Sequence, residues 1–138
     1  LMFRLGNGRS THIIDASLNV AVLIPYKSKE GHELKRFYTL KLLSNNNPTF
    51  SLSWTAMHQM DESSPLFEMS LEEIREQKIL LFVSFTGIDS ILSQTVHSNY
   101  RYTDQDIIRA KKFKDILSNG KDPNTFQIDF EHFHKIDL

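Results

Sequence analysis

The sequence predicts an all-β fold: an immunoglobulin-like β-sandwich of the E-set type, with one or two short helices. Three observations support this fold class. Apolar and polar residues alternate with a period of two over several stretches of strand length. All four prolines and all five glycines lie between these stretches or at their ends. Helix start signals occur at only two places, and both precede short segments.

The length and composition limit the function classes. The chain has 138 residues, so we expect residues 1–138 to form a single domain. The absence of cysteine excludes a disulfide framework and thiolate metal sites. A net charge of −1 gives no basic surface for nucleic acid, and no apolar run approaches the ~18 residues that cross a bilayer. Residues 1–5 already have a strand-like apolar pattern, which favours a piece of a longer polypeptide over a short cloning scar.

The longest alternating segment covers residues 12–24. Its apolar residues are expected to share the core face: Ile14, Ala16, Leu18, Val20, Val22 and Ile24. Asp15 falls on the opposite, polar face, and Pro25 is expected to end the strand. Residues 34–42 alternate in the same way and predict a second strand.

The middle of the chain predicts a turn, a strand and a helix. Residues 45–48 form a turn by composition, and residues 50–56 form a strand with Trp54 on its core face. Residues 58–65 form a loop. Ser70 and Glu73 have the spacing of a capping box, which predicts a helix over residues 71–77.

The second half begins with a nearly continuous apolar run at residues 79–85, typical of a central buried strand. Gly87 is expected to end this strand because glycine permits unusual backbone angles, and Ile88 is expected to follow in a loop. Further strands are predicted at residues 92–102, 113–117 and 126–130, with a short helical turn near residues 103–106.

Two groups of residues suggest chemistry, but each has a simpler explanation. Acids, serines and a histidine crowd the loop after residue 57: His58, Asp61, Glu62, Ser63 and Ser64. They lack a nucleophile elbow, so we expect them to cap backbone groups and predict no catalytic residue. His132 and His134 share one side of a strand, but zinc requires three or four ligands. We therefore predict neither a metal nor a cofactor.

Basic residues gather at two places. The cluster formed by Arg109, Lys111, Lys112 and Lys114 is interpreted as a solvated surface, with contact to anionic lipid or to acids of a partner as the alternative. Arg4 and Arg9 lie near the beginning of the chain. If a membrane segment precedes them, they lie close to lipid headgroups, where each contributes about 1 kcal/mol.

Several segments, in order along the chain, resemble inward-rectifier potassium channels. Residues 1–7, with Arg9, His12, Ile13, Asp15 and Ala16, are similar to the first cytoplasmic strands of that family. Residues 58–66 resemble its His-x-Ile-Asp-x-x-Ser-Pro-Leu segment, and Thr86 with Gly87 resembles its apical loop. Phe133 and His134 are similar to its closing strand, and residues 50–55 favour the bacterial branch.

The resemblance implies the cytoplasmic regulatory domain of a channel, at the cytoplasmic face of the cell membrane. Three identical chains would complete a tetramer, whose ring extends the conduction path, concentrates cations and couples cytosolic movement to gating. Potassium ions would occupy this path, with magnesium or polyamines as blockers, and anionic lipid headgroups would contact the membrane-facing side. The membrane helices and the selectivity filter would lie outside this chain.

The resemblance also implies roles by position. Asp15, Asn46 and Thr86 would line the cytoplasmic pore. Gly87 and Ile88 would form the apical-loop gate, and Arg4 and Arg9 would face the membrane. Thr86 and residues 45–47 are neutral where strong rectifiers carry acids, so we expect only weak voltage-dependent block.

Two alternatives stay open from the residues themselves. A lone domain would use Asp15 simply to keep its outer face soluble, and Gly87 could belong to an ordinary hairpin. Such a chain would be a soluble immunoglobulin-like protein-binding module with no channel role. The resemblance favours the channel domain because it covers the whole chain in order.

Overall fold

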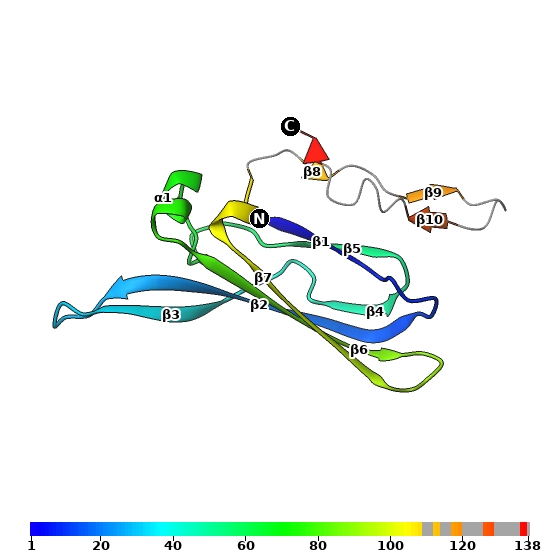
Figure 1. The fold of residues 1–138 in the computed structure, drawn as a ribbon. Coiled ribbons are helices and arrows are strands. Elements are labelled where there is room, and N and C mark those ends of the chain that lie inside the picture. The colour runs from blue at the N-terminus through cyan, green and yellow to red at the C-terminus, as the bar shows by residue number, and fades with distance from the viewer. Residues whose placement is uncertain (109–111, 114–116, 120–125, 129–135, 138) are drawn as a thin grey trace.

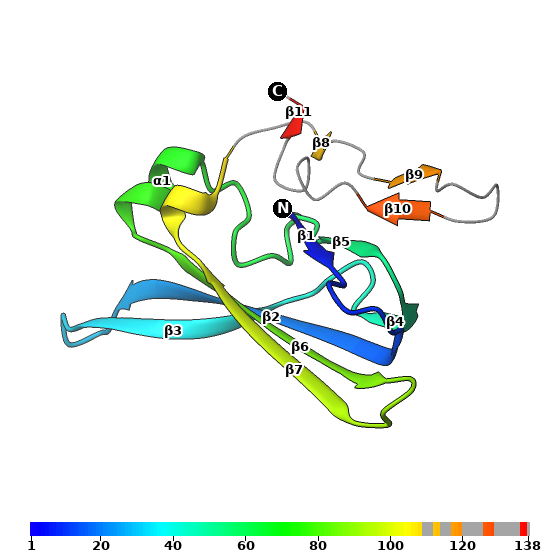
Figure 2. The ribbon, with the colours of Figure 1, turned by 45° about the vertical axis from the view of Figure 1, so that its right-hand side comes forward.

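The computed structural model describes residues 1–108, 112–113, 117–119, 126–128 and 136–137. Two antiparallel sheets pack face to face around one apolar core, so the predicted all-β sandwich is confirmed (Figure 1). The smaller sheet lies over one face of the larger one in both views (Figures 1 and 2). The other face of the larger sheet carries no further layer among the described residues.

The larger sheet is built around β2 (Ile13–Lys27). On one side β2 pairs with β6 (Leu80–Asp89), which in turn pairs with β7 (Thr95–Tyr102). On its other side β2 pairs first with β4 (Asn46–Phe50) and then with β3 (Glu33–Leu40). The β2–β3 hairpin extends beyond the other strands of the sheet (Figure 1).

The smaller sheet consists of β1 (Met2–Gly6) and β5 (Ser53–Met57). Two short ladders follow near the C-terminus: β8 (Lys112–Phe113) pairs with β11 (Ile136–Asp137), and β9 (Leu117–Asn119) pairs with β10 (Phe126–Ile128). These ladders cover parts of the two predicted C-terminal strands. Six residues singled out from the sequence lie outside the described residues: Arg109, Lys111, Lys114, His132, Phe133 and His134.

The predicted helix is confirmed as α1 (Leu71–Glu76). Its capping box is complete: the Glu73 N–H donates to Ser70 Oγ at 3.2 Å, and the Ser70 N–H donates to Glu73 Oε2 at 2.8 Å. These bonds satisfy two backbone donors that a free helix end leaves unpaired. The predicted helical turn is a single 3-10 turn, η1 (Asp104–Asp106).

The core joins residues from both sheets. Its largest fully buried apolar side chains are Leu18, Val20, Val22 and Ile79. Phe50 from the larger sheet contacts Trp54 from the smaller one edge-on, with ring centroids 6.1 Å apart and an angle of 65° between the ring planes. Edge-to-face contact of this kind adds about 1 kcal/mol to the burial of the two rings.

The prediction that Pro25 ends β2 is wrong, because the strand continues to Lys27. The pairing of β2 with β6 stops at Leu23 and Leu80, so Pro25 has a neighbouring strand on the β3 side only. Proline lacks a backbone N–H and is tolerated in a strand where one side is unpaired.

The predicted turn at residues 45–48 is also largely a strand. Residues 46–50 form β4, and the predicted strand at 50–56 is divided between two sheets. Phe50 ends β4 in the larger sheet, and Ser53 begins β5 in the smaller sheet. Composition failed here because β4 lies at a sheet edge, where Pro48 falls between two paired residues, Asn47 and Thr49.

Candidate functional site

Asp15 lies in a β-bulge of β2. The pairs Ile14–Ile88 and Ser17–Thr86 leave two residues of β2, Asp15 and Ala16, opposite the single residue Gly87 of β6. Asp15 adopts a φ of 48°, a left-handed conformation that aspartate tolerates better than most residues. Its side chain is exposed. The predicted position of Asp15 away from the core is therefore confirmed, although a bulge rather than plain alternation places it there.

The bulge also corrects the predicted core face of β2. Ile14 was expected to be buried, but Ile13 is the buried residue, at 4% exposure, and Ile14 is half-buried. One extra residue in a strand reverses which side chains face each side of the sheet. From Ala16 onward the predicted phase is correct, since Ala16, Leu18, Val20 and Val22 are all buried.

Asn46 and Thr86 come together through strand register. Ser17 of β2 pairs with Asn46 of β4 on one side and with Thr86 of β6 on the other. Thr86 in turn pairs with His97 of β7. Residues directly opposite each other in antiparallel strands place their side chains on the same face. We call this line of four residues the polar row: Asn46, Ser17, Thr86 and His97.

The polar row lies on the face of the larger sheet that points away from the core, because Leu18 and Phe85, its neighbours along the strands, are buried. Asp15 precedes Ser17 by two residues. The structure therefore brings the three predicted pore-lining positions to one end of one sheet face. Asn19 and Ser84 pair in the next row and are also exposed.

The same face becomes apolar toward the β2–β3 hairpin. Ala21 pairs with Phe82, and Leu23 pairs with both Leu80 and Phe37. Phe37 is 59% exposed and packs edge-on against Phe82 with ring centroids 5.4 Å apart. An exposed phenylalanine on a sheet face with no covering layer marks a surface suited to contact with another protein chain.

Gly87 lies within β6, so the prediction that it ends the strand is wrong. Its φ is not among the positive ones, so conformational freedom does not explain it. A Cβ atom at this position would lie 2.3 Å from Ile13 Cγ2. Gly87 is therefore required by the close approach of Ile13. Ile88 also lies in the strand rather than in a loop, paired with Ile14 and Thr95, and is half-buried.

The two predicted membrane-facing arginines differ in exposure. Arg4 lies in β1 opposite Thr55 and is only 9% exposed, contrary to the expected surface position. The Arg9 side chain is 44% exposed, and its Nη2 lies 3.0 Å from Asp89 Oδ2. Arg9 Nε donates a second bond to the same oxygen at 3.1 Å.

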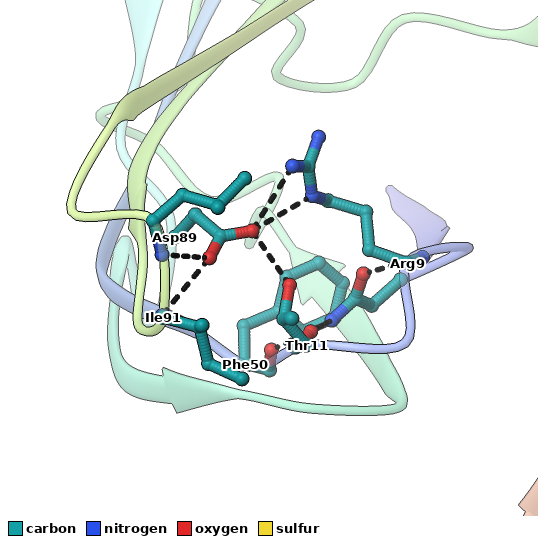
Figure 3. Close-up of polar contacts among 7 residues, drawn as sticks. Arg9, Thr11, Phe50, Asp89 and Ile91 are labelled. Atoms are coloured by element: carbon teal, nitrogen blue, oxygen red, sulfur yellow. Dashed lines mark hydrogen bonds and ion pairs between the residues drawn. The ribbon is translucent and has the colours of Figure 1, made fainter.

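Asp89 is a buried acid that the sequence analysis did not single out. It has no exposed surface, and its carboxylate accepts bonds from Arg9, the Thr11 hydroxyl and the N–H groups of Ile91 and Leu92 (Figure 3). These hydrogen bonds hold the pKa of Asp89 well below its ordinary 3.8, although burial alone would raise it. The largest effects come from the Leu92 N–H and the Thr11 hydroxyl, and smaller ones from Ile91 and Arg9. The sequence did contain a signal: Asp89 continues the buried phase of Val83, Phe85 and Gly87, and a charge there requires partners.

Known proteins similar in sequence to this chain give its family. Residues 1–138 match the family described as the inward rectifier potassium channel C-terminal domain. The chain belongs to this family. The bacterial inward rectifier potassium channel Kirbac3.1 of Paramagnetospirillum magnetotacticum is 35% identical over 136 residues, which are 99% of this chain and 46% of that protein.

Mammalian relatives are more distant from this inward-rectifier domain. The ATP-sensitive inward rectifier potassium channel 12 of Mus musculus is 27% identical over 139 residues, covering 98% of this chain and 32% of that protein. The inward rectifier potassium channel 4 of Homo sapiens is 27% identical over 139 residues, which cover 98% of this chain and 31% of that protein. The chain thus spans less than half the length of these relatives, and the family resemblance seen in the sequence is confirmed.

The loop of this inward-rectifier domain that contains His58 is held together by hydrogen bonds. His58 Nδ1 lies 2.7 Å from the Lys41 carbonyl oxygen, which only accepts, so Nδ1 carries the proton. In the neutral imidazole Nε2 then accepts from the Ser64 hydroxyl at 2.7 Å, and Ser64 Oγ accepts from the Leu66 N–H at 3.1 Å. Both His58 and Ser64 are buried, at 6% and 9% exposure.

The acid of this loop does not complete a catalytic triad. Asp61 Oδ1 accepts from the Ser63 hydroxyl at 2.6 Å and from the Ser63 N–H at 3.0 Å, and these bonds lower the pKa of Asp61. It makes no hydrogen bond to His58 among the contacts of the described residues. The arrangement fits the predicted capping of backbone groups, with a buried histidine–serine pair added to it.

In the described part of the chain, no group of three histidine or acidic side chains is close enough to hold a metal ion. No helix within the same residues is long and apolar enough to span a bilayer.

Proposed function

We propose that this chain is the cytoplasmic regulatory domain of a tetrameric inward-rectifier potassium channel, placed at the cytoplasmic face of the cell membrane. Four copies would surround an axial cation path, with the polar row and Asp15 facing the axis. The observation that carries this proposal is the convergence of Asp15, Asn46 and Thr86 on one sheet face, which no other described segment covers. The family membership supports the channel context.

The backbone at Asp15 supports a functional role for this residue. A left-handed conformation costs a residue with a side chain roughly 1–2 kcal/mol. Such conformations concentrate at functional sites, where the surrounding structure holds them. The bulge turns Asp15 outward, whereas Ile13 and Ala16 of the same strand are buried.

Four copies of Asp15 would attract cations by a calculable amount. At roughly 7 Å from an axial ion, each carboxylate contributes about 0.6 kcal/mol in water, so four contribute about 2.4 kcal/mol to a monovalent ion. Screening at physiological salt reduces this to about 1 kcal/mol, a fivefold rise in local concentration. A divalent ion gains about 2 kcal/mol, or thirtyfold. The ring would concentrate potassium mildly and would bind magnesium or polyamines more strongly.

Asn46 and Thr86 would add dipoles but no charge to this path. Their neutrality leaves Asp15 as the one acid of the three predicted pore-lining positions. The proposed channel therefore has weak voltage-dependent block. Ile88 lies at the Asp15 end of the same face, directly after the core-facing Gly87, and four Ile88 side chains there would form an apolar constriction that gates by dewetting.

The apolar end of the same face would contact neighbouring copies. Phe37 and Phe82, with Leu23 and Leu80, supply a surface that a ring of identical subunits could cover. On the membrane-facing side the proposal keeps Arg9, whose guanidinium is partly exposed, as the contact to anionic lipid headgroups. The burial of Arg4 favours a packing role for that residue.

The proposal is tested by block of the full-length channel by internal magnesium. Asp15→Asn removes all four axial charges and should weaken block by about thirtyfold, given the screened estimate for a divalent ion. Glu30→Gln is the matched control, since Glu30 is exposed in the β2–β3 turn and carries the same charge. Equal block in wild type and Asp15→Asn would falsify the assignment of Asp15. Absence of potassium flux in the wild-type channel would overturn the whole proposal.

A further inference from the structure

The turn between β6 and β7, residues 90–94, is organised by the Asp89 carboxylate. Asp89 Oδ1 accepts from the N–H groups of Ile91 at 3.0 Å and Leu92 at 2.9 Å. The Asp89 N–H donates to the Gln94 carbonyl at 2.8 Å, and the Ser93 N–H donates to the Asp89 carbonyl at 2.9 Å. One residue therefore supplies both the side-chain and the backbone bonds that close this turn.

The other carboxylate oxygen faces a different segment. Asp89 Oδ2 accepts from Arg9 and, at 2.6 Å, from the Thr11 hydroxyl, and both donors belong to the loop between β1 and β2 (Figure 3). The Ser90 N–H also donates to the His12 carbonyl at 3.0 Å. The two oxygens of one buried carboxylate thus connect the turn at 90–94 with the loop at 7–12, which is about 80 residues earlier in the chain.

The loop at 7–12 is itself attached to the sandwich through Asn7. The Asn7 amide donates to the Phe50 carbonyl at 3.1 Å and to the Thr11 carbonyl at 2.9 Å, and Asn7 Oδ1 accepts from the Arg9 N–H at 3.0 Å. Asn7 is buried, at 6% exposure. The hydrogen bonds of Asn7 therefore fix the backbone of Arg9 and Thr11 independently of their side-chain bonds to Asp89.

The outer side of the turn carries two large apolar side chains. Ile91 is 74% exposed and Leu92 is 57% exposed, while the N–H groups of both residues are bound by Asp89. Their backbone is fixed from within and their side chains project outward. They lie directly beyond Gly87 and Ile88 along the chain, at the same end of β6.

We propose that Asp89 is a positioning residue that makes the Ile91–Leu92 tip and the loop at 7–12 move as one unit. The tip completes the apolar constriction that Ile88 begins, and the loop transmits displacement of the chain's first strand to that constriction. This inference rests on the proposed channel function and adds the physical connection through which the gate is set.

Because Oδ1 binds the turn and Oδ2 binds the loop, a substitution can break one set of bonds and keep the other. Asp89→Asn can retain an oxygen toward the Ile91 and Leu92 N–H groups while placing an NH₂ group against Arg9. It should break the link to the loop and preserve the turn. Asp89→Ala should lose both. Arg9→Gln breaks the link from the partly exposed side, so it keeps the test valid if a buried substitution prevents folding.

The measurement is radioactive rubidium flux through the full-length channel in liposomes, paired with amide hydrogen exchange of residues 90–94. The double variant Ile91→Ala/Leu92→Ala should change resting flux by about fivefold or more, and about fivefold is the low end of typical coupling between sites. Asp89→Asn and Arg9→Gln should each change resting flux in the same direction. Exchange at residues 91 and 92 should rise in Asp89→Ala but little in Asp89→Asn. Arg9→Lys should restore much of the wild-type flux, and Arg75→Gln, at an exposed arginine of α1, should leave it unchanged.

Several results would overturn the inference. If the tip variants change flux while Asp89→Asn and Arg9→Gln leave it at the wild-type level, the loop does not set the tip. If the tip variants have no effect, Ile91 and Leu92 do not belong to the constriction. Both results are distinct from failure of the proposed function, in which the wild-type channel itself carries no rubidium.

Discussion

Substitution of Gly87 by alanine tests the close approach of Ile13 to β6. Gly87 faces the core from β6, opposite the bulge in β2. A Cβ atom would lie 2.3 Å from Ile13 Cγ2, and at 3.5 Å from the Phe85 ring and from the Ile14 carbonyl oxygen. The last two are ordinary contacts, so Ile13 alone must yield. Ile13 is buried and branched at Cβ, which leaves its Cγ2 little freedom to move.

Two opposing effects determine the expected change in stability. Alanine loses less backbone entropy on folding than glycine, which favours Gly87→Ala by roughly 0.5–1 kcal/mol. Forcing an extra carbon into a packed core costs typically 1–3 kcal/mol. The contact is much shorter than a normal carbon–carbon distance, so the second effect dominates. We expect the free energy of unfolding to fall by about 1–2 kcal/mol.

A double-mutant cycle in urea identifies the cause. Ile13→Ala removes Cγ2 and on its own should cost about 2–5 kcal/mol through the cavity it leaves. In that background Gly87→Ala meets no obstacle and should be neutral or slightly stabilising. The coupling free energy between positions 13 and 87 is then at least about 1 kcal/mol, which is well above the deviation of about 0.5 kcal/mol seen for mutations at independent sites. The reasoning fails if Gly87→Ala is tolerated in wild type, or if it costs the same with and without Ile13.

Two further predictions concern single hydrogen bonds. Ser70→Ala removes the N-cap of α1 and should lower the free energy of unfolding by about 1 kcal/mol, while Ser63→Ala, at an exposed serine of the preceding loop, is the comparison in the same urea titration. Thr11→Val removes a hydrogen-bond donor to Asp89. Because the pKa of Asp89 is lowered in the folded protein, the ionised carboxylate stabilises the fold above about pH 4, and this stabilisation declines as the pH falls below about 4. Acid unfolding of Thr11→Val, followed by circular dichroism, should therefore begin at higher pH than in wild type, and an unchanged onset would contradict the assigned cause.

The sequence was sufficient where local rules act alone. Alternation identified the buried residues Leu18, Val20 and Val22, and a spacing of three identified the Ser70 cap. These features depend on residues close together in the chain. The same alternation predicted Asp15 on the outer side of β2, and family resemblance added Asn46 and Thr86.

The remaining features depend on contacts between distant segments. Gly87 was misread because its neighbour Ile13 comes from another strand, so a requirement for space resembled a requirement for backbone freedom. The bulge at Asp15 was invisible because only the register against β6 shows an extra residue. Asp89 was overlooked because its partners Arg9 and Thr11 are about 80 residues away, and only folding brings them to one carboxylate.

The central claim is that the sheet face with the polar row surrounds the axis of a fourfold assembly. Pulsed electron paramagnetic resonance on the full-length channel, spin-labelled at Asn46→Cys, tests it most directly, with Thr55→Cys on the exposed side of β5 as the comparison. We predict two distances between labels at position 46, in the ratio of the side to the diagonal of a square, and both shorter than the corresponding distances from position 55. Labels at position 55 that lie closer together than those at position 46 would contradict the account.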